Sequence, residues 1–254
     1  RIGMSSSAFT PAASQPATAL YNQPSAEYAE HLHQALDTLH AAVAEFGAAH
    51  IIQANSLGAE DVVLHHLIER AGLGIPGFVL QTGQLHPETL ALLQHVQQHS
   101  QVPVEVFEPV AEHAIAFVQR EGQDAMYQSI ALRKACCQIR KMEPLARALD
   151  GKAAWITGLR REQSGARAEV PLRDASEAGK PVKLNPLANW TWGDVWHYIA
   201  SHGVRYNPQH DQFYPSIGCA PCTRAISLGE DFRAGRWWWE DDNAKECGLH
   251  VKQA

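Results

Sequence analysis

The chain has 254 residues, of which 45% are apolar and 19% charged, an ordinary composition for a globular protein of one or two domains. Its 21 basic and 27 acidic residues give a net charge of -6, which argues against a protein that coats nucleic acid or an anionic membrane. No run of 18 apolar residues occurs, so no membrane-spanning helix is expected.

The first 26 residues are rich in Ser, Ala, Pro and Gln and carry almost no charge. This composition predicts a disordered arm over residues 1–26, because it offers too little apolar surface to fold, and it lacks the marks of a signal or transit peptide. Beyond the arm, apolar residues recur at helical spacing or in short runs that indicate buried strands. Helices are expected from residue 27, from 59, from 87 and over 111–121, 127–149 and 192–202. Strands are expected over 51–54, 78–80, 102–107, 153–157 and 182–184.

Strands that alternate with helices of ten or more residues predict an α/β fold with an open, mostly parallel sheet flanked by helices. Such a sheet binds ligands beyond the carboxyl ends of its strands, so loops 55–61, 80–86 and 158–167 are the candidate site. We expect residues 27–206 to form the α/β domain. Residues 207–254 are expected to be an irregular, cysteine-bearing C-terminal segment of the same domain.

The cysteines form two pairs and a single thiol. Cys136 and Cys137 are adjacent in a helical pattern, Cys219 and Cys222 form a Cys-x-x-Cys loop, and Cys247 stands near the end. An odd number is not a closed disulfide set, which indicates a reducing cytoplasm. The four paired residues could hold an iron–sulfur cluster or a zinc ion, or remain without metal. Adjacent residues on a helix point about 100° apart, so the sulfurs of Cys136 and Cys137 reach different corners of a cluster more easily than one small ion. Cys247 is either a nucleophile or an inert thiol near the chain terminus.

Two loops carry groups suited to anions. Gly58 lies at a strand-to-helix turn, where backbone N–H groups can bind phosphate, although the Walker and dinucleotide-binding patterns are absent and an ordinary turn is the alternative. Loop 158–167 carries guanidinium groups that suit sulfate or phosphate, with a solvated basic loop as the alternative. These groups belong to Arg160, Arg161 and Arg167.

Together these motifs resemble the assimilatory adenylyl-sulfate (APS) reductases of bacteria, which are related to the phosphoadenylyl-sulfate (PAPS) reductases. The resemblance covers roughly residues 27–250, in the family order. The double cysteine pair with a terminal Glu-Cys-Gly-Leu-His is its most specific feature. The matching stretches are GAEDVVL (58–64), TGQLHPET (82–89), CCQIRK (136–141), TGLRREQS (157–164), IGCAPCTR (217–224), GRWWW (235–239) and KECGLH (245–250).

The resemblance implies an adenine nucleotide alpha hydrolase-like fold and thioredoxin-dependent reduction of APS to sulfite and AMP in sulfate assimilation. It implies that Cys247 attacks the sulfate sulfur, AMP leaves, and thioredoxin, a separate protein, reduces the S-sulfocysteine. It also implies a cytoplasmic homo-oligomer that binds neither nucleic acid nor membrane. A [4Fe-4S] cluster is implied on Cys136, Cys137, Cys219 and Cys222.

The resemblance implies a set of substrate contacts as well. Leu80 and the 55–58 loop match the adenosine side, and His250 lies beside the nucleophile. The basic residues of the sulfate and phosphate pocket are matched by Lys141, Arg167, Arg233 and Arg236. The full expected set is Ser56, Leu57, Gly58, Leu80, Thr82, Gly83, Lys141, Arg160, Arg161, Arg167, Arg233, Arg236 and His250.

Two positions depart from the family pattern. Leu57 stands where the family often has Ser, so a hydroxyl contact is lost or Ser56 supplies it. Gln81 replaces an Asp and keeps hydrogen-bonding ability without the negative charge. Two other functions stay open: a PAPS reductase, although relatives specific for PAPS usually lack the four cysteines, and a zinc-stabilised RNA-binding or RNA-modifying protein.

Overall fold

The computed structural model describes residues 15–241, 244–246 and 248–250. Six strands form one sheet in the order β3-β2-β1-β4-β6-β5, and every neighbouring pair is parallel except β5 with β6. This confirms the open, mostly parallel sheet flanked by helices. The strands are β1 (Ile51–Ala54), β2 (Gly77–Leu80), β3 (Val104–Phe107), β4 (Ala154–Ile156), β5 (Arg173–Asp174) and β6 (Val182–Leu184).

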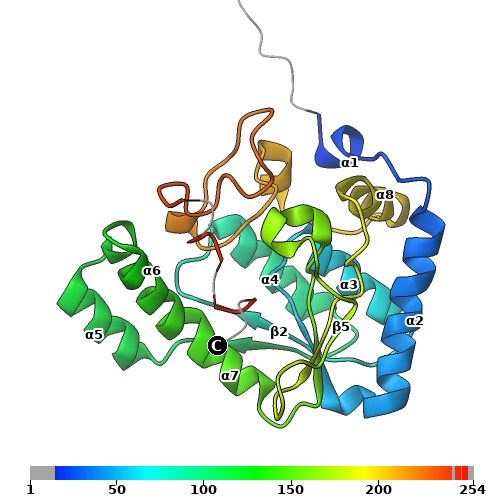
Figure 1. Ribbon diagram of the computed structural model, residues 1–254, viewed down its shortest axis with the longest axis horizontal. Coiled ribbons are helices and arrows are strands. Elements are labelled where there is room, and N and C mark those ends of the chain that lie inside the picture. The colour runs from blue at the N-terminus through cyan, green and yellow to red at the C-terminus, as the bar shows by residue number, and fades with distance from the viewer. Residues whose placement is uncertain (1–14, 242–243, 247, 251–254) are drawn as a thin grey trace, which may run out of the picture.

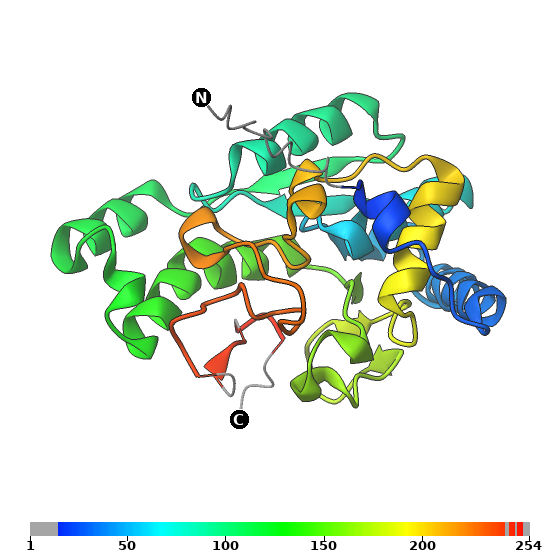
Figure 2. The same cartoon turned by 90° about the horizontal axis from the view of Figure 1, so that it is seen from above.

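Helices cover both faces of the sheet, as Figures 1 and 2 show, with α5 and α6 at one end of the molecule and α2 at the other. The helices of the described residues are α1 (Ala17–Leu20), α2 (Tyr28–Phe46), α3 (Ala59–Arg70), α4 (Pro87–His99), α5 (Ala111–Glu121), α6 (Ile130–Cys137), α7 (Glu143–Leu149) and α8 (Trp192–His202). None of the described helices combines the length and apolar character that crossing a membrane requires.

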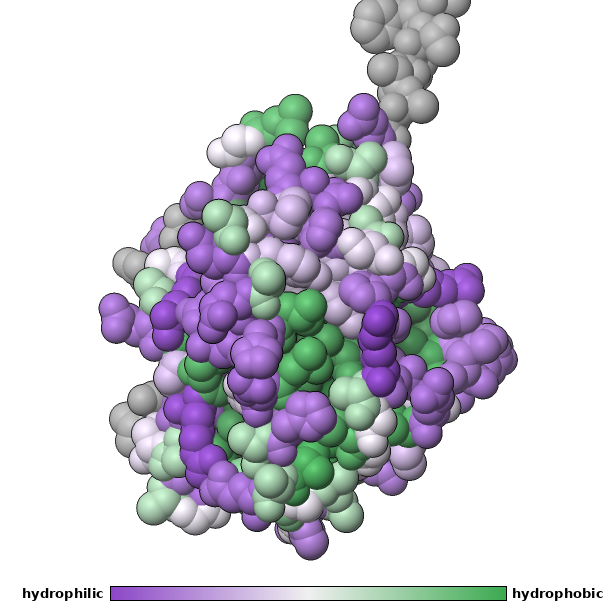
Figure 3. Space-filling view, turned by 90° about the vertical axis from the view of Figure 1, so that its right-hand side faces the viewer, coloured by the Kyte–Doolittle hydropathy of each residue, from purple (hydrophilic) through white to green (hydrophobic). Residues whose placement is uncertain are grey.

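The core lies on two sides of the sheet because side chains alternate along each strand. Ile51 of β1 packs into a large cluster with α2, α3, α4 and α8, whereas Ile52 faces a smaller cluster that contains Trp155 and Leu145 of α7. Figure 3, which looks onto the right-hand side of Figure 1, shows some apolar side chains gathered among hydrophilic ones on that face. The buried strands thus fix the sheet by nonpolar burial on both faces, as expected for a parallel sheet.

Parallel pairing brings the candidate loops together. Strand β1 lies between β2 and β4 and runs parallel to both, so these three strands end at the same edge of the sheet. The loops after β1, β2 and β4 therefore meet, which positions the site described below.

Residues 15–26 differ from the predicted disordered arm, whose first 14 residues lie outside the described part of the chain. Ala17 is buried, α1 packs against α8, and both the backbone and the hydroxyl of Ser25 donate to Asp194 Oδ1 at 2.7 and 2.9 Å. Asp194 is buried at the start of α8, so these contacts satisfy a carboxylate that would otherwise be costly to bury. Partners so distant in sequence leave no local signal in a Ser- and Pro-rich segment.

The helix predicted over 127–149 is divided. Between α6 and α7, residues Gln138–Met142 form a π-helical turn. Pro144 at the start of α7 has no N–H to donate to the preceding turn, which favours a change of hydrogen-bond register there. Such π turns often occur at functional sites, and this one carries Arg140 and Lys141.

Candidate functional site

A cavity of about 210 Å³ opens at the carboxyl ends of β1, β2 and β4, where the sequence placed the site. We call it the strand-end cavity. Its wall combines the three strand-end loops with segments from α3, the π-helical turn and the C-terminal region. Of the expected substrate contacts, the wall includes Ser56, Gly58, Leu80, Thr82, Lys141, Arg167, Arg233, Arg236 and His250.

One wall of the strand-end cavity is basic and holds a carboxylate. Arg167 donates from Nε and Nη2 to the two oxygens of Glu246, each at 2.9 Å, and Arg233 donates from Nη1 to Oε1 at 2.6 Å. Burial would raise the pKa of Glu246, but the two guanidinium groups lower it overall. Two cations around one anion leave this wall with excess positive charge, which suits a sulfate or phosphate ligand.

Arg236 reaches the same cavity because Gly218 lets it pass. A Cβ at position 218 would overlap the guanidinium of Arg236, so a side chain there would displace it. Arg236 donates to Ser216 Oγ at 3.2 Å and lies 4.7 Å from the ring centroid of Trp237. Its Nε is buried and has no hydrogen-bond partner within the described structure, which leaves a donor for a ligand.

His250 is a neutral imidazole in this setting. Its pKa lies well below 6.5, first because burial disfavours the charged ring and then because Lys183, Arg167 and other cations surround it. Its Nδ1 lies 2.8 Å from Lys183 Nζ, so a deprotonated Nδ1 accepts from the ammonium group. A neutral ring can hydrogen-bond a ligand without adding charge to the cavity.

The strand-end cavity is also lined by two polar residues of the expected loop 55–61 that are missing from the expected set of substrate contacts, Asn55 and Asp61. Asn55 Oδ1 accepts from the Leu57 N–H at 2.9 Å and Asp61 Oδ2 accepts from the Ser56 N–H at 2.7 Å. The other polar atom of each side chain, Asn55 Nδ2 and Asp61 Oδ1, is buried without a partner among the described residues. Burial raises the pKa of Asp61 to about 6. The signal available in the sequence was an acidic residue, Asp61, in the first turn of a helix expected to follow a ligand-binding loop.

The two departures from the family pattern have local explanations. Leu57 adopts a left-handed backbone with φ of 65°, and its side chain is buried in the core rather than in the cavity wall. Ser56 lies in the wall instead. Gln81 Oε1 accepts from the Gly83 N–H at 2.9 Å, so it shapes the turn after β2, and Gly83 does not line the cavity.

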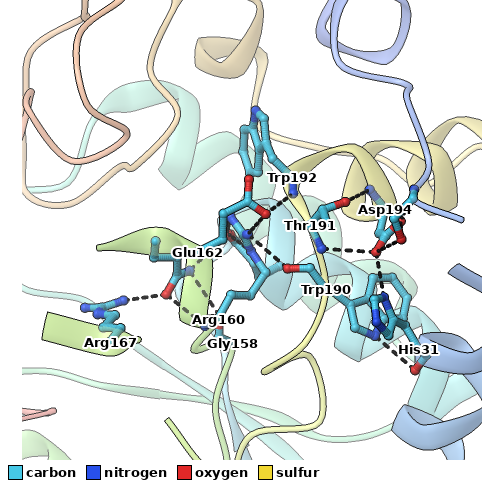
Figure 4. A network of polar contacts seen from close by, with 12 residues as sticks. His31, Gly158, Arg160, Glu162, Arg167, Trp190, Thr191, Trp192 and Asp194 are labelled. Carbon is cyan, nitrogen blue, oxygen red and sulfur yellow. Dashed lines mark hydrogen bonds and ion pairs between the residues drawn. The ribbon is translucent and has the colours of Figure 1, made fainter. Parts of the chain in front are cut away.

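Of the three guanidinium groups in loop 158–167, two point away from the strand-end cavity. Arg160 is fully buried; its Nε donates to Glu60 Oε1 at 3.0 Å and its Nη1 to the Trp190 carbonyl at 3.3 Å (Figure 4). Arg161 is exposed and donates to the Val170 carbonyl at 2.8 Å. Arg160 thus joins the loop to α3 and the start of α8, and the ligand-facing group of this loop is that of Arg167.

The four paired cysteines line a second cavity, which we call the cysteine cavity. Cys136 and Cys137 enter it from α6 and Cys219 and Cys222 from the Cys-x-x-Cys loop, and none of the four is in a disulfide. Burial and the neighbouring Cys219 raise the pKa of Cys222 to about 12. Thiolates in this place therefore need a compensating positive centre.

The cysteine cavity gathers four thiols around one space without the geometry of a closed metal site among the described residues. Among the described residues, no three His, Cys, Asp or Glu side chains converge closely enough to hold one metal ion. The four thiols nevertheless surround one space, and Thr82 Oγ1 lies 3.2 Å from Cys219 Sγ. Lys141 lines both this cavity and the strand-end cavity, so a charge in one is felt in the other.

Cys247 lies outside the described residues. Its neighbours on both sides meet the strand-end cavity: Glu246 through the basic wall, and Leu249 and His250 as part of the lining. Nine of the thirteen expected substrate contacts and the four paired cysteines thus line two adjoining cavities that share Lys141.

Comparison with known proteins agrees with this geometry. Residues 50–225 match the phosphoadenosine phosphosulfate reductase domain. The adenosine 5'-phosphosulfate reductase of Allochromatium vinosum is 53% identical over 203 residues, covering 80% of this chain and 79% of that protein. The enzyme of the same name from Burkholderia cepacia is 49% identical over 218 residues, covering 85% of this chain and 87% of that protein.

Solved structures show the same fold. The crystal structure of a phosphoadenylyl-sulfate reductase from Candida auris, in a phosphate complex, matches with a TM-score of 0.63 and 25% identity. The match covers 78% of this chain and 97% of that chain. Candida glabrata FMN adenylyltransferase matches with a TM-score of 0.56 at 11% identity, covering 91% of this chain and 81% of that one, which shows a shared fold alone.

Proposed function

The chain belongs to the phosphoadenosine phosphosulfate reductase family, and we propose that it reduces adenylyl sulfate (APS) to sulfite and AMP in sulfate assimilation. Its relatives at 53% and 49% identity are named adenosine 5'-phosphosulfate reductases, which makes APS rather than PAPS the substrate. The observation that carries the proposal is one cavity lined by two kinds of polar residue. Asn55 and Asp61 each have a buried polar atom without a partner among the described residues, and Arg167, Arg233 and Arg236 supply guanidinium groups. A nucleoside joined to a phosphate–sulfate anhydride matches this lining, because its nucleoside end can hydrogen-bond the polar residues and its anionic end can pair with the guanidinium groups.

We propose Cys247 as the nucleophile. Its thiolate attacks the sulfate sulfur, a sulfur–sulfur bond forms, the bond from sulfur to the bridging oxygen breaks, and AMP leaves with the electron pair. Arg167, Arg233 and Arg236 would stabilise the charge that develops on the phosphate. The cationic surroundings of the segment also favour the thiolate form of a cysteine.

The second step needs two electrons from outside the chain. A dithiol protein such as thioredoxin attacks the S-sulfocysteine, sulfite is released, and the donor is left as a disulfide. This requirement supports thioredoxin as the partner and the reducing cytoplasm as the location. A homo-oligomer stays a prediction.

A [4Fe-4S] cluster is the proposed cofactor, held by Cys136, Cys137, Cys219 and Cys222. When bound, such a cluster supplies a redox-active, charged centre beside the substrate. The chain's own contributions are Lys141, which lies between the two cavities, and Thr82, whose hydroxyl contacts Cys219. We assign the binding and charge stabilisation to these residues and to the arginines of the basic wall.

The proposal is tested by purifying the full chain without oxygen and assaying sulfite release from APS and from PAPS with reduced thioredoxin. We expect sulfite from APS and much slower release from PAPS. Iron and acid-labile sulfide should be present in the preparation. A colourless protein with stoichiometric zinc would refute the cluster, and faster turnover of PAPS would refute the substrate assignment.

A further inference from the structure

Arg133 lies on α6, one turn before the adjacent cysteines, and its side chain is fully buried. It lines the cysteine cavity but not the strand-end cavity, so it does not contact the site proposed for APS. A buried guanidinium is costly unless charge and hydrogen bonds compensate it. Its partners therefore indicate what this arginine does.

Four side-chain hydrogen bonds of Arg133 go to the C-terminal segment, which is red in Figure 1 and passes α6. Nε and Nη2 donate to the two carboxylate oxygens of Glu240 at 2.8 and 2.7 Å. Nη2 also donates to the Ala244 carbonyl at 2.7 Å, and Nη1 to the Glu246 carbonyl at 3.0 Å. The Trp237 ring centroid lies 4.5 Å from Cζ. One side chain thus fixes the segment at several points between 237 and 246.

Glu246 is held from a second side. Its main-chain carbonyl accepts from Arg133, while its carboxylate accepts from Arg167 and Arg233 of the basic wall. The residue that precedes position 247 is therefore fastened to the cysteine-bearing helix through its backbone and to the strand-end cavity through its side chain. Irregular segments are usually more mobile than the elements they connect, so this anchoring sets the segment apart.

We propose that Arg133 is a positioning residue for sulfur transfer: it holds the main chain at Ala244 and Glu246 on α6, so that the chain enters position 247 from a fixed point beside the strand-end cavity. The inference rests on the proposed role of Cys247. A guanidinium suits this task because its planar fork can pair with a carboxylate and still donate to two carbonyls. Lysine keeps the charge beside Glu240 but cannot make the same four contacts.

The test replaces Arg133 with lysine in the full chain, purified without oxygen. The kcat for sulfite release should fall roughly 10- to 100-fold, because a displacement of about 1 Å at the reacting atoms has such an effect. The Kd for AMP should stay within about twofold, because Arg133 lies outside the strand-end cavity. The iron content should not change, because lysine keeps the positive charge beside the cysteine cavity that Arg133 lines. Arg173→Lys, which alters an exposed pair with Glu45, is the matched control and should behave as the unmodified protein.

A second measurement does not depend on turnover. Brief treatment with iodoacetamide followed by mass spectrometry gives the alkylation rate of Cys247, which should rise about tenfold in Arg133→Lys when the segment is released. Unchanged alkylation with unchanged kcat would overturn the proposal. So would an activity loss matched by an equal loss of AMP affinity or of iron, since that pattern means general damage.

If the unmodified chain releases no sulfite, the proposed function fails, and the alkylation rates alone then decide whether Arg133 anchors the segment. If Arg133→Lys does not fold, the double variant Arg133→Gln with Glu240→Gln removes both buried charges together and is measured in its place. It should show the same fall in kcat and the same rise in alkylation; wild-type values for both would contradict the proposal.

Discussion

Asp61 is a buried acid at the start of α3 whose ionised form is expensive to keep in the folded protein. Burial raises its pKa from 3.8 to about 6, and Oδ1 has no hydrogen-bond partner among the described residues. At pH values above 6 this rise is equivalent to roughly 3 kcal/mol of lost folding free energy. The perturbation that removes this cost is Asp61→Asn.

The sign of the effect follows from proton binding. Because the folded state binds the proton more tightly than the unfolded state, the carboxyl stabilises the fold below pH 3.8 and loses that contribution as the pH rises through 6. Between pH 7.5 and pH 5, a shift from 3.8 to about 6 gives a gain of about 1 kcal/mol. Asp61→Asn cannot titrate, so the difference in unfolding free energy between the two proteins should change by that amount.

Urea unfolding of both proteins at pH 5, 6 and 7.5 measures this difference. Other titrating groups, such as His210 with a pKa lowered to about 4 by its burial, affect both proteins alike and cancel. The variant should be the more stable of the two at pH 7.5. Parallel pH profiles would refute the reasoning, because they would mean that Asp61 is not a strained carboxylate.

A role in ligand binding would explain why the protein keeps a carboxylate at position 61 despite its cost to folding stability. Its unpartnered oxygen lies in a residue that lines the strand-end cavity, where it can accept a hydrogen bond from the nucleoside. Asp61→Asn should therefore weaken AMP binding roughly tenfold, the size of one hydrogen bond to a charged group. Calorimetric titration with AMP measures it, with Glu45→Gln on the surface as the control. Unchanged affinity would remove Asp61 from ligand recognition.

Two further substitutions test the walls of the cavities. Gly218→Ala should displace the Arg236 guanidinium and raise the KM for APS roughly tenfold in steady-state assays. Gly165→Ala is the control, because the space around Gly165 is open, and it should leave the KM unchanged. Equal effects of the two substitutions would contradict the close approach of Arg236 to position 218. Lys141→Met should lower kcat/KM for APS by about 100-fold while iron content is kept, and full activity would show that its charge is not used.

Much of the fold follows from local signals. Runs such as 51–54 are apolar on both faces, which identifies buried parallel strands, and Thr191 with Asp194 forms the capping box that begins α8. The edge strand β5 has two charged residues and no apolar pattern, so nothing in the sequence indicated it. The order of residues 17–26 depends on partners more than 160 residues away.

The sequence predicted which loops and which cysteine pairs form the candidate site, but not how each side chain in them is oriented. Arg160 and Arg167 share a loop and a residue type, yet Glu60 of α3 draws one into the core while the other faces the cavity. The importance of Asp61 depends on Gly158 in the loop after β4, where a side chain would overlap its carboxylate. Such contacts between elements distant in sequence cannot be read from either element alone.

The central claim is that the sulfur of APS is transferred to Cys247. The direct measurement is mass spectrometry of the peptide containing Cys247 after the anaerobic protein reacts with APS in the absence of any dithiol. The account predicts one added SO₃ group on this cysteine for each AMP released, and no adduct in Cys247→Ser. Adduct on another cysteine, or sulfite release by Cys247→Ser once thioredoxin is added, would contradict it.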